Sequence, residues 1–498
     1  MITHNPRKAI FFILTIGVLV LSGEFLYAEG DCLSEREKIL IQRIEDLEKK
    51  VKELENLINN VGEKERVKVE RGLSSLSEEQ KSYSLDNEKT IKEENSKKGK
   101  VNTELKPVWK DRLTFRTEDK SFEVQVGGRL HLDWAFFDND KGLKYAFGEE
   151  EDGVQFRRAR IDFSGKIYEN VQYRMEFDFA GDRDLSGKGK FTDVYITFVD
   201  FPYLGNLQVG HYREPFGLER LTNNNYITFL ERGLNDTFTP KRNVGFMAFD
   251  SVFDNRFIWQ AGIFKETDDF PSDDDTNEDK GYSFTGRIVY LPLFKNDGKQ
   301  LLHLGLAYSY RDYDGIPFRY KTQPECALAY TYLDTDRYEG FRLSTDALVD
   351  DVNLVGSELL FIYGPWSLQG EYMTSFVDTY LGGNQRFSGG YLYTSYFLTK
   401  ETRAYNRDNG ILSRIRPINN FDPKSGKWGA WEVGLRYSWI DLNSEIIRGG
   451  EERNWTLGLN WYLNPNTRLM LNYTRADIQH DLYEGVLDIF QTRFQIDF

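Results

Sequence analysis

Arginines spaced two residues apart are the feature of this chain most able to do chemistry. Within Val154–Gly165, Arg158 and Arg160 alternate with apolar residues, and Asp162 and Ser164 continue the same parity. A guanidinium group stays charged at physiological pH and offers a planar fork of donors that matches phosphate oxygens. Several of them along one wet wall would concentrate anions there.

Such alternation is typical of a β-strand, whose successive side chains point to opposite faces. In a soluble sandwich the apolar face would enter a core, whereas in a membrane barrel it would meet lipid and the polar face would line a lumen. The pattern recurs in segments of about ten residues separated by turns, which favours the barrel. These segments are Phe122–Phe136, Val171–Ala180, Tyr282–Tyr290, Leu302–Tyr310, Trp428–Leu442 and Trp455–Leu463.

The composition agrees with a barrel that has aromatic girdles and a polar interior. The 498 residues are 15% aromatic and 29% charged, with a net charge of −15. The acidic balance argues against nucleic acid as a partner. The two cysteines, Cys32 and Cys326, lie in different segments, so we predict neither a disulfide framework nor a cysteine metal site.

The N-terminus predicts export from the cytoplasm. Arg7 and Lys8 precede the apolar run Ala9–Leu21, and Ala28 closes a predicted signal peptide over residues 1–28. The run is too short to span a bilayer comfortably as a helix. The sequence contains no other long apolar run, so a membrane-spanning mature chain would have to be a β-barrel.

Residues 33–61 predict a short α-helical coiled coil. Leucines or valine recur every seven residues from Leu33 to Val61, and Ile44, Val51 and Ile58 occupy the partner heptad position. An alternative is a single amphipathic helix that packs on its own barrel. Residues 62–106 are rich in Lys, Glu, Ser and Asn and predict a charged flexible linker.

The lengths of the connectors predict the number of strands. Short turns and long loops alternate, as in outer-membrane barrels. The alternation holds only if Asp312–Asp350 is one outer loop and Lys400–Lys427 is a long inner turn. Asp441–Glu451 and Ile478–Leu487 are counted as longer outer loops. The prediction is an all-β, 16-stranded antiparallel transmembrane β-barrel over residues 107–498, with both ends periplasmic, preceded by the coiled coil.

The chain ends in another alternating segment, Ile489–Phe498. Phe490, Phe494 and Phe498 share the face expected to meet lipid. A terminal phenylalanine on such a strand resembles the signal that the barrel assembly machinery reads. We therefore expect that machinery and outer-membrane lipid to be partners of the chain.

Several stretches, taken together, resemble the phosphate-selective porin O and P family. They lie at residues 127–138, 156–167, 209–222, 224–246, 355–372, 396–405 and 428–442. The resemblance covers Phe122–Phe498. It implies a trimeric 16-stranded barrel whose third outer loop, residues 214–242 here, folds inward as a constriction. It also implies a ladder of lumen arginines that conducts phosphate or similar anions.

Candidate pore residues come from the family motifs and from the alternation. The anion-pathway candidates are Arg129, Arg158, Arg160, Arg174, Arg287, Arg319, Lys321 and Arg436. The candidates in the constriction loop are Arg232, Lys241 and Arg242. By alternation, Arg157 would face outward unless a bulge intervenes.

Carboxylates on the same predicted face leave other interpretations open. They are Asp133, Asp162, Glu176, Asp178, Glu358, Glu371 and Glu432. Any single arginine could instead form an ion pair that holds the wall or the loop. The pore would then be a weakly selective general porin. In a different class, the barrel would be structural, and its coiled coil would tether it to the cell envelope.

No constellation in the sequence favours an enzyme. His131 and Asp133 share a face but have no paired serine nucleophile, and the histidines lack metal-ligand spacing. The acidic stretch Asp268–Asp279 lacks the glycine and terminal glutamate spacing of an EF-hand. We therefore predict no cofactor and no metal. The predicted function is passive diffusion of small anions through a porin of the bacterial outer membrane, with the coiled coil in the periplasm.

Overall fold

The computed structural model describes residues 104–109, 111–180, 190–267, 281–315, 317–336 and 342–498. The predicted signal peptide, the predicted coiled coil and the linker up to residue 103 lie outside these described residues, as does the acidic stretch Asp268–Asp279.

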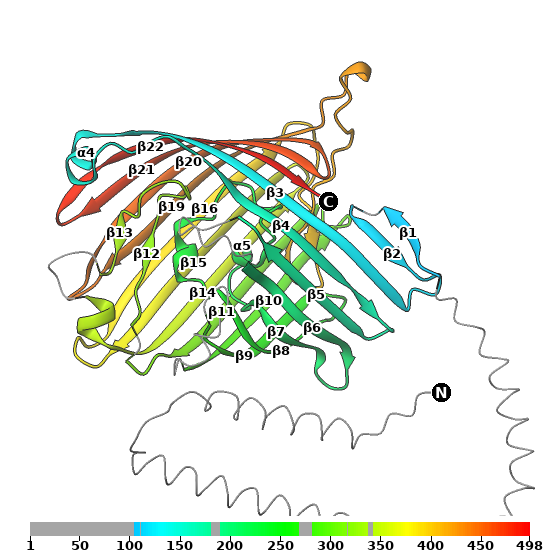
Figure 1. Cartoon of the computed structure of the whole chain (residues 1–498), viewed down its shortest axis with the longest axis horizontal. Coiled ribbons are helices and arrows are strands. Elements are labelled where there is room, and N and C mark those ends of the chain that lie inside the picture. Colours follow the sequence, from blue (N-terminus) through cyan, green and yellow to red (C-terminus); the bar gives the residue numbers. More distant parts are fainter. Residues whose placement is uncertain (1–103, 110, 181–189, 268–280, 316, 337–341) are drawn as a thin grey trace, which may run out of the picture. The chain divides into compact units, whose positions relative to one another are not determined.

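Sixteen antiparallel strands form a closed barrel (Figure 1). In chain order they are β3 (Phe122–Asn139), β4 (Gly153–Ile167), β5 (Val171–Asp178), β6 (Lys190–Phe201), β7 (Gly205–Arg213), β8 (Arg242–Val252), β9 (Phe257–Lys265), β10 (Tyr282–Lys295), β11 (Gln300–Asp312), β14 (Val349–Tyr363), β15 (Trp366–Thr379), β16 (Gln385–Phe397), β19 (Ala430–Asn443), β20 (Arg448–Asn464), β21 (Thr467–His480) and β22 (Tyr483–Asp497). The predicted strand number is confirmed.

The last strand closes the barrel against the first. β22 pairs antiparallel with β3 from Leu487 opposite Asn139 to Asp497 opposite Arg129. Two further backbone hydrogen bonds, of 2.8 and 3.0 Å, join Gly128 to Phe498. The first strand begins and the last strand ends at the same rim, called the terminal rim below.

A short hairpin precedes the barrel at the terminal rim. It consists of β1 (Lys106–Trp109) and β2 (Leu113–Arg116), and β2 pairs with the first residues of β3. Arg112 of the hairpin reaches Asp162 on β4 at 2.9 Å. The hairpin thus pairs with the first residues of β3, on the edge that β22 covers further along the strand.

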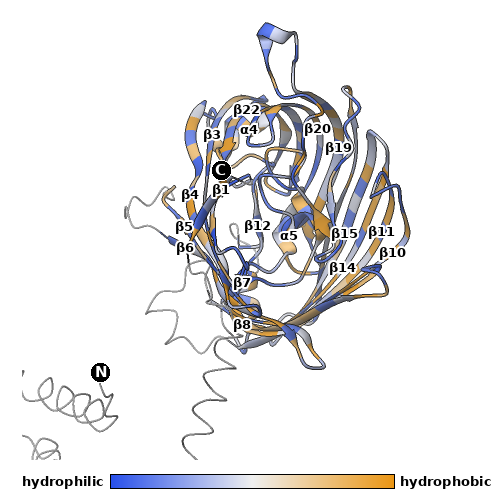
Figure 2. Ribbon diagram, turned by 90° about the vertical axis from the view of Figure 1, so that its right-hand side faces the viewer, coloured by the Kyte–Doolittle hydropathy of each residue, from blue (hydrophilic) through white to orange (hydrophobic). Residues whose placement is uncertain are grey.

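Alternation along the strands sorts side chains as the two-residue period predicts. On β3, Leu130 and Phe136 are exposed on the outer surface, whereas Arg129, His131 and Asp133 are buried on the lumen side. Figure 2 shows the resulting ring of strands seen along the barrel, with α5 and β12 inside it. None of the described helices is long and apolar enough to cross a bilayer.

Three long connectors enter the lumen or cover it. The inward loop, residues 214–241, contains α5 (Leu218–Leu221) and a 3₁₀ turn (Leu234–Phe238). The outer loop, residues 313–348, contains β12 (Lys321–Thr322), β13 (Leu333–Asp334) and a π-helical turn (Leu343–Ala347). The inner turn, residues 398–429, contains β17 (Tyr405–Asn406), β18 (Ile411–Leu412) and a 3₁₀ turn (Pro423–Ser425). The remaining helix, α4 (Lys141–Phe147), lies in the first outer loop.

Two predicted outer loops, Asp441–Glu451 and Ile478–Leu487, are wrong in length, because the structure has short turns there. β20 already begins at Arg448, and β21 and β22 run to His480 and from Tyr483, so the connectors shrink to residues 444–447 and 481–482. Polar residues here belong to strands: Arg475 on β21 is ion-paired to Asp488 on β22 at 2.9 Å. A polar strand and a loop look alike in sequence once a strand carries charge on its outer face.

Candidate functional site

The inward loop is the element that narrows the lumen. At its start, the carboxylate of Glu214 accepts hydrogen bonds from Arg311 on β11, at 3.0 and 3.1 Å, and from Asn243 on β8 at 2.5 Å. Near its middle, Glu231 forms ion pairs with Arg157 at 3.0 Å and with Arg493 at 2.7 Å. Buried charges paired from several strands hold the loop in one position.

Arginines on the opposite wall also hold this loop by its main chain. They donate to three of its carbonyl oxygens: Arg468 to Ile227 at 2.8 Å, Arg493 to Leu230 at 2.5 Å and Arg436 to Glu231 at 3.0 Å. The guanidinium of Arg436 also lies 4.4 Å from the centroid of the Phe229 ring. These guanidinium groups therefore satisfy loop carbonyls that would otherwise be buried without a donor.

A β-bulge on β4 brings one more arginine into the lumen. The register passes from His131 opposite Arg158 directly to Leu132 opposite Phe156, so Arg157 is the extra residue. Its Nε lies 3.0 Å from Glu231. Simple alternation would point Arg157 outward, but the bulge that the sequence analysis allows for is present and shifts the parity at this point.

Between the inward loop and strands β3 to β9 lies a cavity of about 290 Å³, called the arginine cavity below. Four arginines line it, Arg129, Arg174, Arg213 and Arg242, together with one carboxylate, that of Asp193. Its neutral polar lining residues include Gln208, Asn223 and Gln260. In a narrow space with low-dielectric walls, this excess of guanidinium groups favours anions.

Carboxylates that line the arginine cavity or lie next to its arginines offset part of this charge. Glu176 on β5 forms ion pairs with Arg129 and, at 2.9 Å, with Arg174. Arg242 lies 2.7 Å from Asp193. Asp162 also lies 3.7 Å from Arg174. Among the described residues, three carboxylates therefore form ion pairs with arginines of the cavity, of which there are four, so guanidinium groups remain in excess.

Arg213 differs from the other three cavity arginines in its partners. It donates to the carbonyl oxygens of Arg220 at 2.6 Å and of Thr222 at 3.2 Å, both in the inward loop. Within the described part of the chain, no carboxylate forms an ion pair with it. Its guanidinium charge therefore acts on the cavity with little direct neutralisation.

Arg213 was not among the sequence candidates. It lies at the end of β7, two residues after His211, so alternation places both on the lumen face. The signal was present, because the stretch Val209–Thr222 carries part of the family resemblance. Of the predicted residues, Arg129, Arg174 and Arg242 are brought together at this cavity.

Two predicted arginines lie in ion-pair clusters beside the cavity. Arg160 donates to Asp178 at 2.6 Å and to Glu176 at 2.8 Å. Arg158 lies 3.4 Å from the ring nitrogen Nδ1 of His131 and 3.9 Å from Glu231. Neither residue lines the arginine cavity.

Two further candidates are completely enclosed. Arg287 is 2% exposed and binds Glu358 through two hydrogen bonds of 2.8 and 2.7 Å. Arg436 is fully buried and lies 2.5 Å from Glu325 in the outer loop. A guanidinium this enclosed and paired holds the structure together and is not accessible to a passing ion.

The remaining candidates lie in loops. Arg319, whose side chain is 46% exposed, lies 3.6 Å from Asp334, and Lys321 is exposed on β12; both are in the outer loop. Arg232 donates to the carbonyl of Glu219 at 2.9 Å, within the inward loop. Lys241 is exposed at the end of that loop. None of these four lines the arginine cavity.

Two glutamates of the inward loop differ in their acidity. Burial raises the pKa of Glu219 to about 7, although Arg436 lies 3.9 Å away and opposes the rise. Burial also acts to raise the pKa of Glu231, but Arg157 and the neighbouring arginines outweigh it and hold that pKa well below its usual value. Glu231 is therefore a permanent anion, whereas Glu219 gains or loses its proton near neutral pH.

A closed 16-stranded barrel with an apolar outer surface and a polar, arginine-bearing lumen defines an outer-membrane porin, a channel and not an enzyme. The profile of the family described as "Phosphate-selective porin O and P" matches residues 124–498. The chain belongs to that family.

The chain is also similar to individual proteins. Porin O of Pseudomonas aeruginosa is 28% identical over 415 residues, covering 78% of this chain and 91% of the relative. An uncharacterised protein of Caulobacter vibrioides is 28% identical over 382 residues, covering 75% of this chain and 72% of the relative. Among solved structures, the anion-selective porin from Comamonas acidovorans is 14% identical, with a TM-score of 0.47, and covers 76% of this chain and 100% of its own.

Proposed function

We propose that this porin passes small anions, phosphate among them, by passive diffusion through the arginine cavity. The observation that carries the proposal is the convergence of Arg129, Arg174, Arg213 and Arg242 on one cavity beside the inward loop. Guanidinium groups pair bidentately with phosphate oxygens. Several moderate sites in sequence let an ion enter without being trapped.

Phosphate competition with chloride current tests this proposal. In planar bilayers containing the full-length protein, inorganic phosphate added to a chloride solution should reduce the chloride current, because both anions compete for the same guanidinium groups. Sulfate serves as the comparison, since it has similar size and oxygens. A chloride current unchanged by phosphate would reject phosphate as a substrate of the cavity.

A weakly selective general porin is the second candidate. The observation that favours it is the pairing of lumen charges, as in the Arg160 contacts with Glu176 and Asp178. Paired charges cancel over short distances, leaving a field across the pore and little preference for either sign. A general porin would show equal chloride currents with and without phosphate and a weak ion preference.

We further propose the setting in which the barrel works. The family resemblance supports a homotrimer in the outer membrane. β22 ends one residue before Phe498, and the outward side chains of Phe490 and Phe494 are exposed, which supports recognition by the barrel assembly machinery and contact with lipid. The predicted N-terminal coiled coil would lie in the periplasm.

A further inference from the structure

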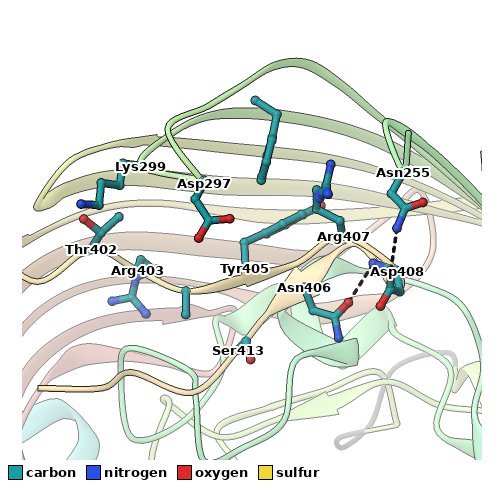
Figure 3. Close-up of a pocket in the computed structure, with 13 residues that line it drawn as sticks. Asn255, Asp297, Lys299, Thr402, Arg403, Tyr405, Asn406, Arg407, Asp408 and Ser413 are labelled. Atoms are coloured by element: carbon teal, nitrogen blue, oxygen red, sulfur yellow. Dashed lines mark hydrogen bonds between the residues drawn. The ribbon is translucent and has the colours of Figure 1, made fainter. Parts of the chain in front are cut away.

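The tip of the inner turn lies between two cavities. Asn409 and Ile411 line the arginine cavity. Residues 402–408 of the same segment line a second cavity of about 560 Å³, together with Asn255, Asp297 and Lys299 from turns at the terminal rim (Figure 3). The segment that runs from β17 through residues 407–410 to β18, called the inner hairpin below, therefore borders both spaces.

Arg287 on β10 holds the tip of the inner hairpin from the barrel wall. Its Nη2 donates to the carbonyl of Gly410 at 2.9 Å, and its Nη1 donates to the carbonyl of Asn409 at 3.2 Å. Nη1 also reaches Gln260 at 3.0 Å, a residue that lines the arginine cavity. Because Glu358 pairs with the remaining side of the fork, Arg287 contributes little field to the lumen while it fixes two carbonyls.

Gly410 makes this close approach possible. Its φ is +64°, a left-handed conformation that favours glycine. A Cβ at this position would lie 3.3 Å from Val289 and 3.5 Å from Nη1 of Arg287. The tip is thus seated directly against the wall at β10.

Other contacts tie the inner hairpin to the wall and to the inward loop. The hydroxyl of Tyr405 lies 2.7 Å from Nδ1 of His303, whose Nε2 lies 3.0 Å from Glu358. The N–H of Leu412 donates to the hydroxyl of Thr222 in the inward loop at 3.3 Å. Leu412 also packs in an apolar cluster with Leu218 of α5. The two lumen segments therefore touch each other, and β10, β11 and β14 support the hairpin.

We propose that the inner hairpin is the partition between the arginine cavity and the cavity at the terminal rim, and that Arg287 is the positioning residue that sets its place and hence the width of the passage. The inference rests on the proposed function, because it takes the arginine cavity as part of the conducting path. It gives Arg287 a role in the size of what passes, distinct from a role in attracting anions.

Two substitutions separate position from charge. Arg287→Gln removes both the charge and the fork. Arg287→Lys keeps the charge but offers three donors on one atom, in place of the five hydrogen bonds that the planar fork of Arg287 makes to Glu358, Gln260 and the two carbonyls. If Arg287 positions the hairpin, both variants should raise single-channel conductance and admit larger polyethylene glycols in a polymer-exclusion series. The lysine variant should keep the zero-current potential of the unmodified protein, because it keeps a positive charge opposite Glu358. A lysine variant with the unmodified size limit, or a glutamine variant that changes only ion preference, would overturn the proposal.

A third variant keeps the test valid if loss of Arg287 prevents folding. Replacing residues 406–410 with two glycines removes the tip and leaves Arg287 paired to Glu358. This truncation should raise the size limit, and adding Arg287→Gln to it should raise the limit no further, because the carbonyls held by Arg287 are gone. A truncated channel with the unmodified limit would exclude the hairpin as the partition. A cation preference in the unmodified protein would instead refute the proposed function alone, since the size limit is measured with neutral polymers.

Discussion

At the scale of single residues, lumen arginines in this porin differ by what their guanidinium groups contact. Arg287 and Arg436 are enclosed by carboxylates and carbonyls, and each holds a segment inside the lumen against the barrel wall. Arg213 and Arg242 border open volume. The same residue type on the same face of a strand thus serves either packing or permeation. The difference depends on which loop folds against each arginine.

Arg242→Gln should lower the anion preference. The change removes one of four cavity guanidinium groups and leaves Asp193, its partner at 2.7 Å, as an unpaired anion beside the path. We expect the permeability ratio of chloride to potassium to fall in bilayer measurements. Arg319→Gln is the matched control, because Arg319 is half-exposed in the outer loop and does not line the arginine cavity. Equal effects of the two variants would contradict the assignment of the cavity.

Glu219 should make conduction depend on pH. Its pKa of about 7 lies above that of a free glutamate, so the folded loop holds a proton that an exposed carboxyl would lose. The contribution of this carboxyl to the free energy of unfolding is therefore largest at acid pH, where it is protonated in both states. It falls as the pH rises towards 7 and stays low above that pH.

The measurement is the zero-current potential at about pH 6 and about pH 8, on either side of that pKa. Ionised Glu219 adds a negative charge beside the pore, so the anion preference should be lower at the higher pH. Glu219→Gln should weaken this dependence, because it removes the titrating carboxyl and leaves Glu231, which stays ionised throughout. A dependence of undiminished size in the glutamine variant would assign the titration to another group.

At the scale of elements, the two-residue period predicts the strands and the family resemblance implies the inward loop, whereas nothing in the sequence indicates that the inner turn enters the lumen. A two-residue period identifies a strand without knowledge of its neighbours, and it placed Arg129, Arg174 and Arg436 on the inner face correctly. The bulge at Arg157 is a single irregularity, so a repeating pattern in the sequence does not show where it lies. The inner turn was expected as a long connector, but its entry into the lumen depends on contacts with Arg287 and Thr222, which are far away in sequence.

Glu231→Gln should loosen the inward loop. The substitution removes the carboxylate shared by Arg157 and Arg493, although Arg493 keeps its pair with Asp133 at 2.7 Å. Leaving polar groups of the loop anchor without a partner costs about 1–3 kcal/mol. We expect noisier open-channel current and a lower midpoint of thermal unfolding by circular dichroism. Glu445→Gln is the control, because Glu445 is exposed in the connector 444–447. Identical current noise in both variants would mean that Glu231 does not fix the loop.

At the scale of the whole molecule, barrel closure depends only on residues within the family match. β3 and β22 pair directly, so closing the barrel requires no contact from the residues that precede β3. The class of protein was predictable because lipid outside and water inside impose one rule on every strand. The arginine cavity was predictable only in part, since three of its four arginines were named while the loop contacts that shape it were not.

Deleting Leu33–Val101 should leave a conducting channel. The deletion removes the predicted coiled coil and most of the linker but retains β1, β2 and the whole barrel. We expect the single-channel conductance of the unmodified protein, with any loss confined to subunit association measured by native electrophoresis. A deleted protein that folds but conducts nothing would favour the alternative in which the N-terminal region is the working part.

The most direct test of anion passage through the arginine cavity is the zero-current potential of the unmodified protein across a potassium chloride gradient. Because the four guanidinium groups at that cavity outnumber the carboxylates paired with them among the described residues, chloride should carry most of the current, and the sign of the potential should be that of an anion-selective pore. A potential of the opposite sign, showing that potassium carries the current, would contradict the account.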